Sequence, residues 1–182
     1  MLPNEFSRKI GAEMKRFSIR SGGQTGVDRA ALDAAAAQSI AYSGWCPLGG
    51  WAEDMPHPPG LLLRYPQLTP TPSPRPEQRT AWNVRDSDAT LLVVRDDRVS
   101  SPGTLFARTC AELVFAKPIY IASDGLADAI EPSFEWARQA MKRHPTGFVL
   151  NVAGPRESEA PGIYEEARTF LDALFERLRV TL

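Results

Sequence analysis

Short apolar runs alternate along the chain with segments that have helical spacing. Five runs have the length and composition of strands, at residues 16–20, 40–47, 89–94, 118–122 and 147–154. The segments between and after them predict helices over about 27–38, over about ten residues before the third run, within 101–118, over 132–144 and over 162–178. In the last of these, an apolar stripe runs through Tyr164, Ala167, Leu171, Leu174 and Leu178.

This alternation predicts an α/β fold. The expected strands are continuous apolar runs rather than strictly alternating ones, which is typical of a parallel sheet with helices on both faces. We expect five or more mainly parallel strands in the order 2-1-3-4-5. That order places a switch point between the strands ending at Arg20 and Val94, and ligands bind at such points beyond the carboxyl ends of the strands.

Length and composition limit the remaining possibilities. The 182 residues suit a single domain, with an N-terminal arm at 1–14 and a Pro-rich flap at 50–76. Net charge is −1 without any block of like charges, so a nucleic-acid partner is not expected. No stretch is apolar enough for a membrane span or a signal peptide, which predicts a cytoplasmic protein without membrane partners.

A glycine-rich loop, SGGQTG, joins the first expected strand to the first expected helix. Glycines let the backbone approach a ligand closely, and a helix N-terminus offers unpaired N–H groups. The loop therefore predicts a cradle for a phosphate or another anion, although the same sequence could make a tight turn without a ligand. Its candidate ligand-binding residues are Gly22, Gly23, Gln24, Thr25 and Gly26.

A second loop, SSPGTLFA, follows the third expected strand. Its candidates are Gly103 and Thr104, and Thr104 could cap the helix that follows. Cap and turn chemistry alone would explain this loop equally well. Because it follows a strand of the same parallel sheet, we expect it to open on the same edge as the first loop.

A third loop, AGPRESEAPGIY, follows the last expected strand. Its candidates are Gly154, Arg156 and Ser158. The forked guanidinium of Arg156 suits a phosphate or a carboxylate. The competing interpretation is an exposed loop in which Arg156 pairs with Glu157 or Glu159.

A polar stripe precedes the third expected strand. Arg79, Asn83 and Asp86 are spaced for one face of a helix, and Ser87 follows them. We expect these four residues to join the ligand site, although such a stripe is more often a solvated face.

Catalytic and metal chemistry have weaker support in the sequence. Glu53 and Asp54 are adjacent carboxylates that could act in general acid–base catalysis or hold a metal, but a single carboxylate pair without supporting His or Cys ligands is weak evidence for either. We therefore expect no metal site. Cys46 and Cys110 are expected to be ordinary buried thiols.

Several segments together resemble the molybdenum cofactor carrier family, over roughly residues 17–178. They are SGGQTGVDRAALDAA, GWCPLGGWAED, RTAWNVRDSDATLL, PGT and LNVAGPRESEAPGIY. This family belongs to a Rossmann-like superfamily that includes the Lonely Guy phosphoribohydrolases and the DNA-processing protein family. The resemblance implies a doubly wound Rossmann-like three-layer fold and a homodimer or homotetramer. It also implies a pocket for a nucleotide-like or pterin-phosphate ligand, with molybdenum cofactor as cargo.

The sequence departs from these relatives at two places. The carrier family usually has Gly-Arg-x-Ala-Glu-Asp-Gly after the second strand, and here Gly50 replaces the Arg and Met55 the last Gly. The Lonely Guy enzymes carry PGGxGTxxE, and here SPGTLFARTCAE lacks the Glu at that spacing. Two function classes follow: a binding protein that carries or senses a small molecule, and a hydrolase of nucleotides or nucleoside phosphates. The missing Glu favours the binding protein.

Overall fold

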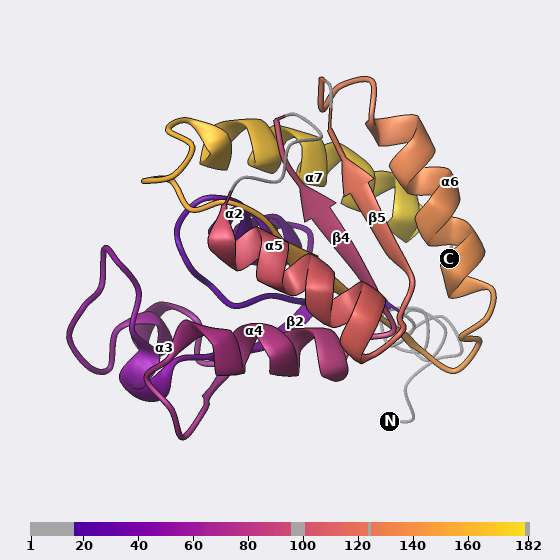
Figure 1. The fold of residues 1–182 in the computed structure, drawn as a ribbon. Helices are drawn as coiled ribbons and strands as arrows, with labels where there is room; N and C mark the ends of the chain where they lie inside the picture. Colours follow the sequence, from indigo (N-terminus) through magenta and orange to yellow (C-terminus); the bar gives the residue numbers. More distant parts are fainter. Residues whose placement is uncertain (1–16, 96–100, 124, 181–182) are drawn as a thin grey trace, which may run out of the picture.

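The computed structural model describes residues 17–95, 101–123 and 125–180, and it shows an α/β fold around one parallel sheet (Figure 1). The strands are β1 (Phe17–Arg20), β2 (Ala41–Cys46), β3 (Leu68–Pro70), β4 (Ala89–Val93), β5 (Ile119–Ala122) and β6 (Phe148–Ala153). The helices are α2 (Val27–Ala37), α3 (Leu61–Arg64), α4 (Pro76–Arg85), α5 (Pro102–Thr109), α6 (Ile130–Met141) and α7 (Ile163–Val180), with short turns η1 (Leu48–Gly50) and η2 (Cys110–Val114). The N-terminal arm expected at residues 1–14 lies outside the described residues.

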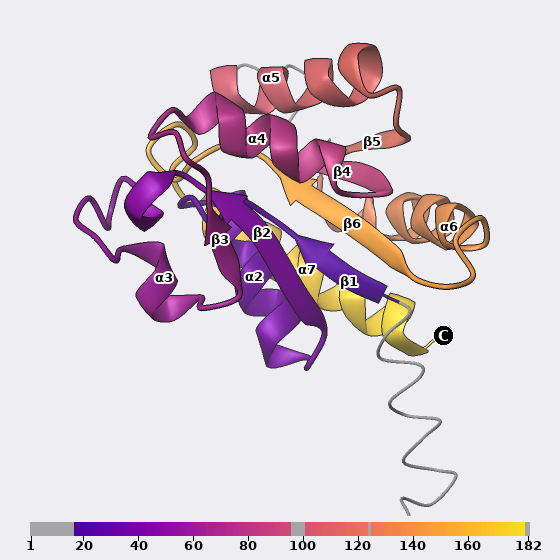
Figure 2. The same cartoon turned by 90° about the horizontal axis from the view of Figure 1, so that it is seen from below.

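Helices cover both faces of the sheet, so the molecule has three layers (Figure 2). α4 and α5 pack together on one face, while α2 and α7 pack together on the other, with α6 beside α7. The main core lies between the sheet and the α2–α7 layer, where Ile19, Leu91, Leu150 and Phe175 are fully buried. The expected three-layer fold with mainly parallel strands is confirmed.

The expected helices and strands occur close to their predicted positions. Pro76 begins α4 and Pro102 begins α5, where the missing N–H of proline removes no helical hydrogen bond. Along α7, the predicted stripe faces the core: Tyr164 is half-buried, and the other four members of the stripe are buried. Periodicity therefore located α7 because this helix buries a single apolar face.

The predicted strand order is wrong. The observed order is β3-β2-β1-β6-β4-β5, so the last strand of the chain lies in the middle of the sheet. β6 pairs with β1 through Ile19 and Leu150, and with β4 through Leu91 and Val152. Apolar content marked these runs as buried strands, but it does not specify which buried strands are neighbours.

The strand order becomes regular when the strands are numbered from β6. Without the edge strand β3, and with β6 first, followed by β1, β2, β4 and β5, the sheet reads 3-2-1-4-5, as in the first five strands of a doubly wound Rossmann sheet. The point where the strand order reverses therefore lies between β6 and β4, and not between β1 and β4 as the sequence predicted. A ligand crevice is expected beyond the carboxyl ends of these two strands.

The Pro-rich segment at 50–76 contains more regular structure than expected. It contributes α3 and the edge strand β3, which extends the sheet next to β2. Leu61 and Tyr65 are buried there, in a small second core with Leu32 and Cys46. Within the described ranges, no helix is both long and apolar enough to cross a membrane.

Candidate functional site

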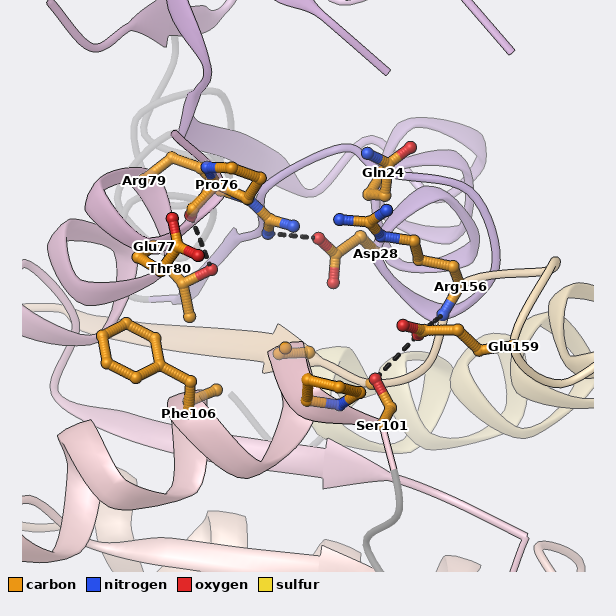
Figure 3. A pocket seen from close by; sticks show the side chains of 15 residues that line it. Gln24, Asp28, Pro76, Glu77, Arg79, Thr80, Ser101, Phe106, Arg156 and Glu159 are labelled. Carbon is orange, nitrogen blue, oxygen red and sulfur yellow. Dashed lines mark hydrogen bonds and ion pairs between the residues drawn. The ribbon is translucent and has the colours of Figure 1, made fainter. Parts of the chain in front are cut away.

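A cavity of about 340 Å³ lies at the carboxyl edge of the sheet, at the end of β6 and beside the start of α5 (Figure 3). Its walls come from the loop after β1, the first turns of α4 and α5, and the loop after β6. The lining residues are Gln24, Asp28, Pro76, Glu77, Arg79, Thr80, Ser101, Pro102, Gly103, Phe106, Ala107, Ala153, Gly154, Arg156 and Glu159. The three loops that the sequence singled out therefore meet at the observed switch point.

Five of the candidate residues line this cavity: Gln24, Arg79, Gly103, Gly154 and Arg156. The others do not line it: Gly22, Gly23, Thr25, Gly26, Asn83, Asp86, Ser87, Thr104 and Ser158. Several of the second group hold the cavity walls in place, as the contacts below show.

Two glycines bring separate loops into contact. Gly26 has φ 73° and ψ −131°, and a Cβ atom there would lie 2.4 Å from the carbonyl oxygen of Pro155. The N–H of Val27 donates to that same carbonyl at 3.2 Å. A Cβ atom on Gly22 would lie 2.0 Å from Nη1 of Arg79. The first loop can therefore touch both the loop after β6 and the side chain of Arg79.

A buried ion pair forms one wall of the cavity. Nη1 of Arg79 donates to Oδ2 of Asp28 at 2.7 Å, and only 8% of Arg79 and 3% of Asp28 are exposed. Burial raises the pKa of Asp28, although the Arg79 charge acts in the opposite direction. Arg29, the neighbour of Asp28 in sequence, instead donates two hydrogen bonds of 2.9 Å to Asp54.

Arg156 reaches the cavity from the opposite side to Arg79, and both side chains extend toward Asp28 (Figure 3). Its guanidinium lies 5.7 Å from the centre of the Trp51 ring. The alternative pairing with Glu157 or Glu159 does not occur in the described structure: Glu157 accepts from backbone N–H groups, and Glu159 accepts from the N–H of Arg156 rather than from its side chain. The guanidinium therefore carries a positive charge with no ion-pair partner among the described residues.

The first turn of α5 forms another wall of the cavity. Ser101, and not Thr104 as the sequence suggested, is the N-cap, since its hydroxyl accepts from the N–H of Thr104 at 3.5 Å. The same hydroxyl donates to a Glu159 carboxylate oxygen at 2.7 Å. Gly103 faces the cavity, whereas the buried hydroxyl of Thr104 has no hydrogen-bond partner among the described residues.

Glu53 ties three loops together. Its carboxylate accepts from the hydroxyls of Thr25 and Ser158, and its N–H donates to the side-chain carbonyl of Gln24 at 3.0 Å. Burial raises the pKa of Glu53, but these hydrogen bonds outweigh burial and leave the pKa below its ordinary value. A hydrogen bond from Arg29 likewise lowers the pKa of Asp54. Neither carboxylate lines the cavity, and both are held as anions, so their geometry fits positioning better than proton transfer.

The lower part of the polar stripe on α4 points to β2 instead of the cavity. The Asn83 side chain accepts from the N–H of Trp45 at 2.7 Å and donates to its carbonyl at 2.9 Å. Asp86 accepts from the indole N–H of Trp45, and Ser87 donates to the carbonyl of Val84. Asn83 and Asp86 therefore bind α4 to β2, and Ser87 bonds back to the last turn of α4. Arg79 alone of the stripe lines the cavity.

Ten of the fifteen lining residues were not among the candidate ligand-binding residues. They include four side chains that shape the cavity: Pro76, Glu77, Phe106 and Glu159. Phe106 was detectable in principle, because it lies one helical turn after Gly103 and so shares its face. The other three had no signal, since they come from a helix start and a loop whose approach depends on the tertiary fold.

The thiols and histidines contribute no site. Cys46 and Cys110 are buried and free, as predicted, and burial raises the pKa of Cys46 to about 11, so its thiol stays protonated at neutral pH. His144 lies 3.4 Å from Asp88, and His57 is in the exposed Pro-rich loop. No group of three metal-ligating side chains occurs in the ranges that the structure describes.

Comparisons with known proteins agree with the observed fold. A crystal structure of a "Putative molybdenum carrier protein" from Syntrophus aciditrophicus SB superposes with a TM-score of 0.76 at 34% sequence identity, covering 88% of this chain and 95% of that chain. None of the curated proteins matches the chain. The model of the circularly permutated YpsA SLOG family matches residues 19–175, in keeping with a sheet whose order becomes regular when the count starts at the last strand. The chain therefore belongs to the circularly permutated YpsA SLOG family.

Proposed function

We propose that this protein binds a phosphate-bearing small molecule, nucleotide-derived or pterin-based, and acts as its carrier or sensor. The solved relative is described as a molybdenum carrier, and on this basis molybdenum cofactor is the first candidate cargo. The proposal concerns binding at the cavity between the ends of β6 and β4.

One observation carries the proposal: the guanidinium of Arg156 faces a cavity at the switch point without an ion-pair partner among the described residues. Gln24 and the first turn of α5 add polar groups to the same space. A cationic group beside a helix N-terminus favours an anionic ligand. The charge of Arg79 is already balanced by Asp28, so Arg156 is the main source of attraction.

Hydrolysis of the Lonely Guy type has less support. In the signature PGGxGTxxE, the Glu follows the Thr by three residues, and that place is Ala107 here. Ala107 lines the cavity, so the position is in the site but has no carboxylate. Glu77 and Glu159 also line the cavity, and they are the groups to test if turnover is found.

A ligand screen tests the proposal. Purified protein would be titrated calorimetrically with ribose 5-phosphate, GMP and molybdenum cofactor, and its mass spectrum recorded under native conditions to detect bound ligand. We expect binding of at least one phosphate-bearing compound without release of free base or inorganic phosphate. Multiple turnover of GMP would favour the hydrolase, and failure of all three compounds to bind would contradict the proposal.

We also propose that the protein is a homodimer or homotetramer in solution. The support is the family resemblance together with exposed apolar side chains after α5, where Leu113 is 79% and Val114 is 62% exposed. Light scattering at micromolar concentration should give two or four times the 20.0 kDa chain mass. A mass equal to one chain would contradict it.

A further inference from the structure

A second hollow of about 390 Å³ adjoins the cavity. It is formed by the Pro-rich segment, which the anion site leaves unexplained, and by the turn after β2. Its lining residues are Leu48, Gly49, Trp51, Pro56, Pro58, Pro74 and Pro76. We refer to it below as the Trp51 trough.

The lining of the Trp51 trough is flat and poor in hydrogen-bond donors. Proline has no backbone N–H, so a wall built from four prolines offers rigid apolar faces and few polar contacts. Trp51 is half-buried and adds an aromatic face, while Leu48 is 52% exposed. Such walls suit a planar ring that stacks rather than a polar chain that needs hydrogen bonds.

The trough and the cavity share structure at two points. Pro76 lines both hollows, as the first residue of α4. Arg156 lines the cavity, and its guanidinium lies 5.7 Å from the centre of the Trp51 ring. One molecule could therefore place an anionic group at Arg156 and extend its remainder over Pro76 into the trough.

We propose that the Trp51 trough is the subsite for the planar heteroaromatic ring of the ligand whose phosphate occupies the cavity. This inference rests on the proposed function and adds the chemical class of the ligand, which is a phosphate joined to a purine-like or pterin-like ring. Trp51 supplies the stacking face, and Arg156 marks the boundary between ring and phosphate.

The test uses isothermal titration calorimetry to compare two probes, ribose 5-phosphate and GMP, of which only GMP carries the heteroaromatic guanine base. The wild-type protein should bind GMP at least about fivefold more tightly, the lower end of what stacking one base on an aromatic side chain contributes. Trp51→Leu should abolish that preference while changing the affinity for ribose 5-phosphate less than about threefold. Trp51→Phe, which keeps an aromatic face, should retain part of the preference.

Phe106→Leu is the competing variant, because Phe106 is the aromatic side chain inside the cavity itself. Loss of the GMP preference in Phe106→Leu but not in Trp51→Leu would overturn the proposal. Equal weakening of both probes in Trp51→Leu would overturn it too, as would a wild-type protein that binds both probes equally. If neither probe binds, the anion site fails first and the trough proposal falls with it.

Discussion

Individual polar side chains near the cavity have two different environments. Glu53 accepts hydrogen bonds from neighbouring loops and Arg79 pairs with Asp28 of α2, so both charges are balanced within the protein. Arg156 contacts the Trp51 ring and no carboxylate among the described residues. Substitutions at these positions should therefore separate stability from ligand binding.

Arg156→Ala should weaken binding of a phosphate-bearing ligand by roughly 1.5–3 kcal/mol, the contribution of a charge-assisted hydrogen bond. The melting temperature should change little, because no ion pair with the described residues is lost. Calorimetric titration and thermal denaturation measure the two quantities. Arg108→Ala, which removes a surface pair with Glu112, is the control and should leave affinity unchanged. Unchanged affinity with lower stability in Arg156→Ala would show that the residue is structural.

Glu53→Gln should lower the free energy of unfolding by about 1 kcal/mol at pH 7, because the two hydroxyls donate to different carboxylate oxygens and the amide replaces one of these acceptors with an NH2 donor. The folded pKa of Glu53 lies below its ordinary 4.5, so its ionised form stabilises the fold above that pH. This stabilisation is lost as the pH falls through the folded pKa. The gap in unfolding free energy between wild type and Glu53→Gln, measured by urea denaturation, should therefore narrow as the pH falls below 4.5. A gap of constant size at all pH values would contradict this account.

Whole elements are positioned by the turns that join them. The turn before α2 needs a backbone conformation at Gly26 that other residues strongly disfavour, while the turn before α5 uses an ordinary cap, Ser101, followed by Pro102 and Gly103. The two loops contribute to the same cavity, yet they tolerate different residues.

Gly26→Ala and Gly103→Ala form a matched pair. Gly26→Ala should lower the free energy of unfolding by at least about 2 kcal/mol, because it forces a strained φ and places Cβ 2.4 Å from the carbonyl oxygen of Pro155. A Cβ on Gly103 meets nothing within 4 Å, so Gly103→Ala should change stability by less than about 0.5 kcal/mol. Chemical denaturation measures both variants. Equal stability of the two would contradict the proposed role of Gly26.

The sheet of the whole molecule is a Rossmann sheet whose first strand comes last in the chain. A chain that started at β6 would have to connect the end of α7 to the start of β1. These two ends lie close in space, since the Phe17 ring of β1 lies 6.0 Å from the ring of Phe175, near the end of α7. The turn between α6 and β6, at residues 142–147, is largely exposed. The chain could therefore start at β6 without changing the sheet.

A permutant that begins at Pro145 and joins the end of α7 to β1 through a flexible linker should fold to the same structure. Permutation is tolerated where the cut lies in an exposed turn and the original ends lie close together. The circular dichroism spectrum should match that of the wild type, with a cooperative thermal transition. A cut inside β6, between Leu150 and Asn151, is the control and should prevent folding because it divides a central strand. A permutant at Pro145 that stays unfolded would show that the natural order of synthesis is required.

Local sequence was sufficient to predict the elements and part of the candidate site. Periodicity located α7, which buries one face, and continuous apolar runs identified strands in a sheet that helices cover on both faces (Figure 2). Glycine, capping residues and position after a strand indicated that three loops meet at one edge. One predicted residue from each loop, Gln24, Gly103 and Arg156, does line the cavity.

The neighbours of each strand and the partners of each charged side chain depend on the tertiary structure. β6 separates β1 from β4, and this moved the switch point, because parallel strands of similar apolar content carry no local signal for their order. Asp28 pairs with Arg79, 51 residues away, instead of with the adjacent Arg29. Glu159 and Pro76 enter the cavity through the approach of distant loops. Contacts between residues far apart in sequence depend on how the layers pack, and no short stretch of sequence encodes that packing.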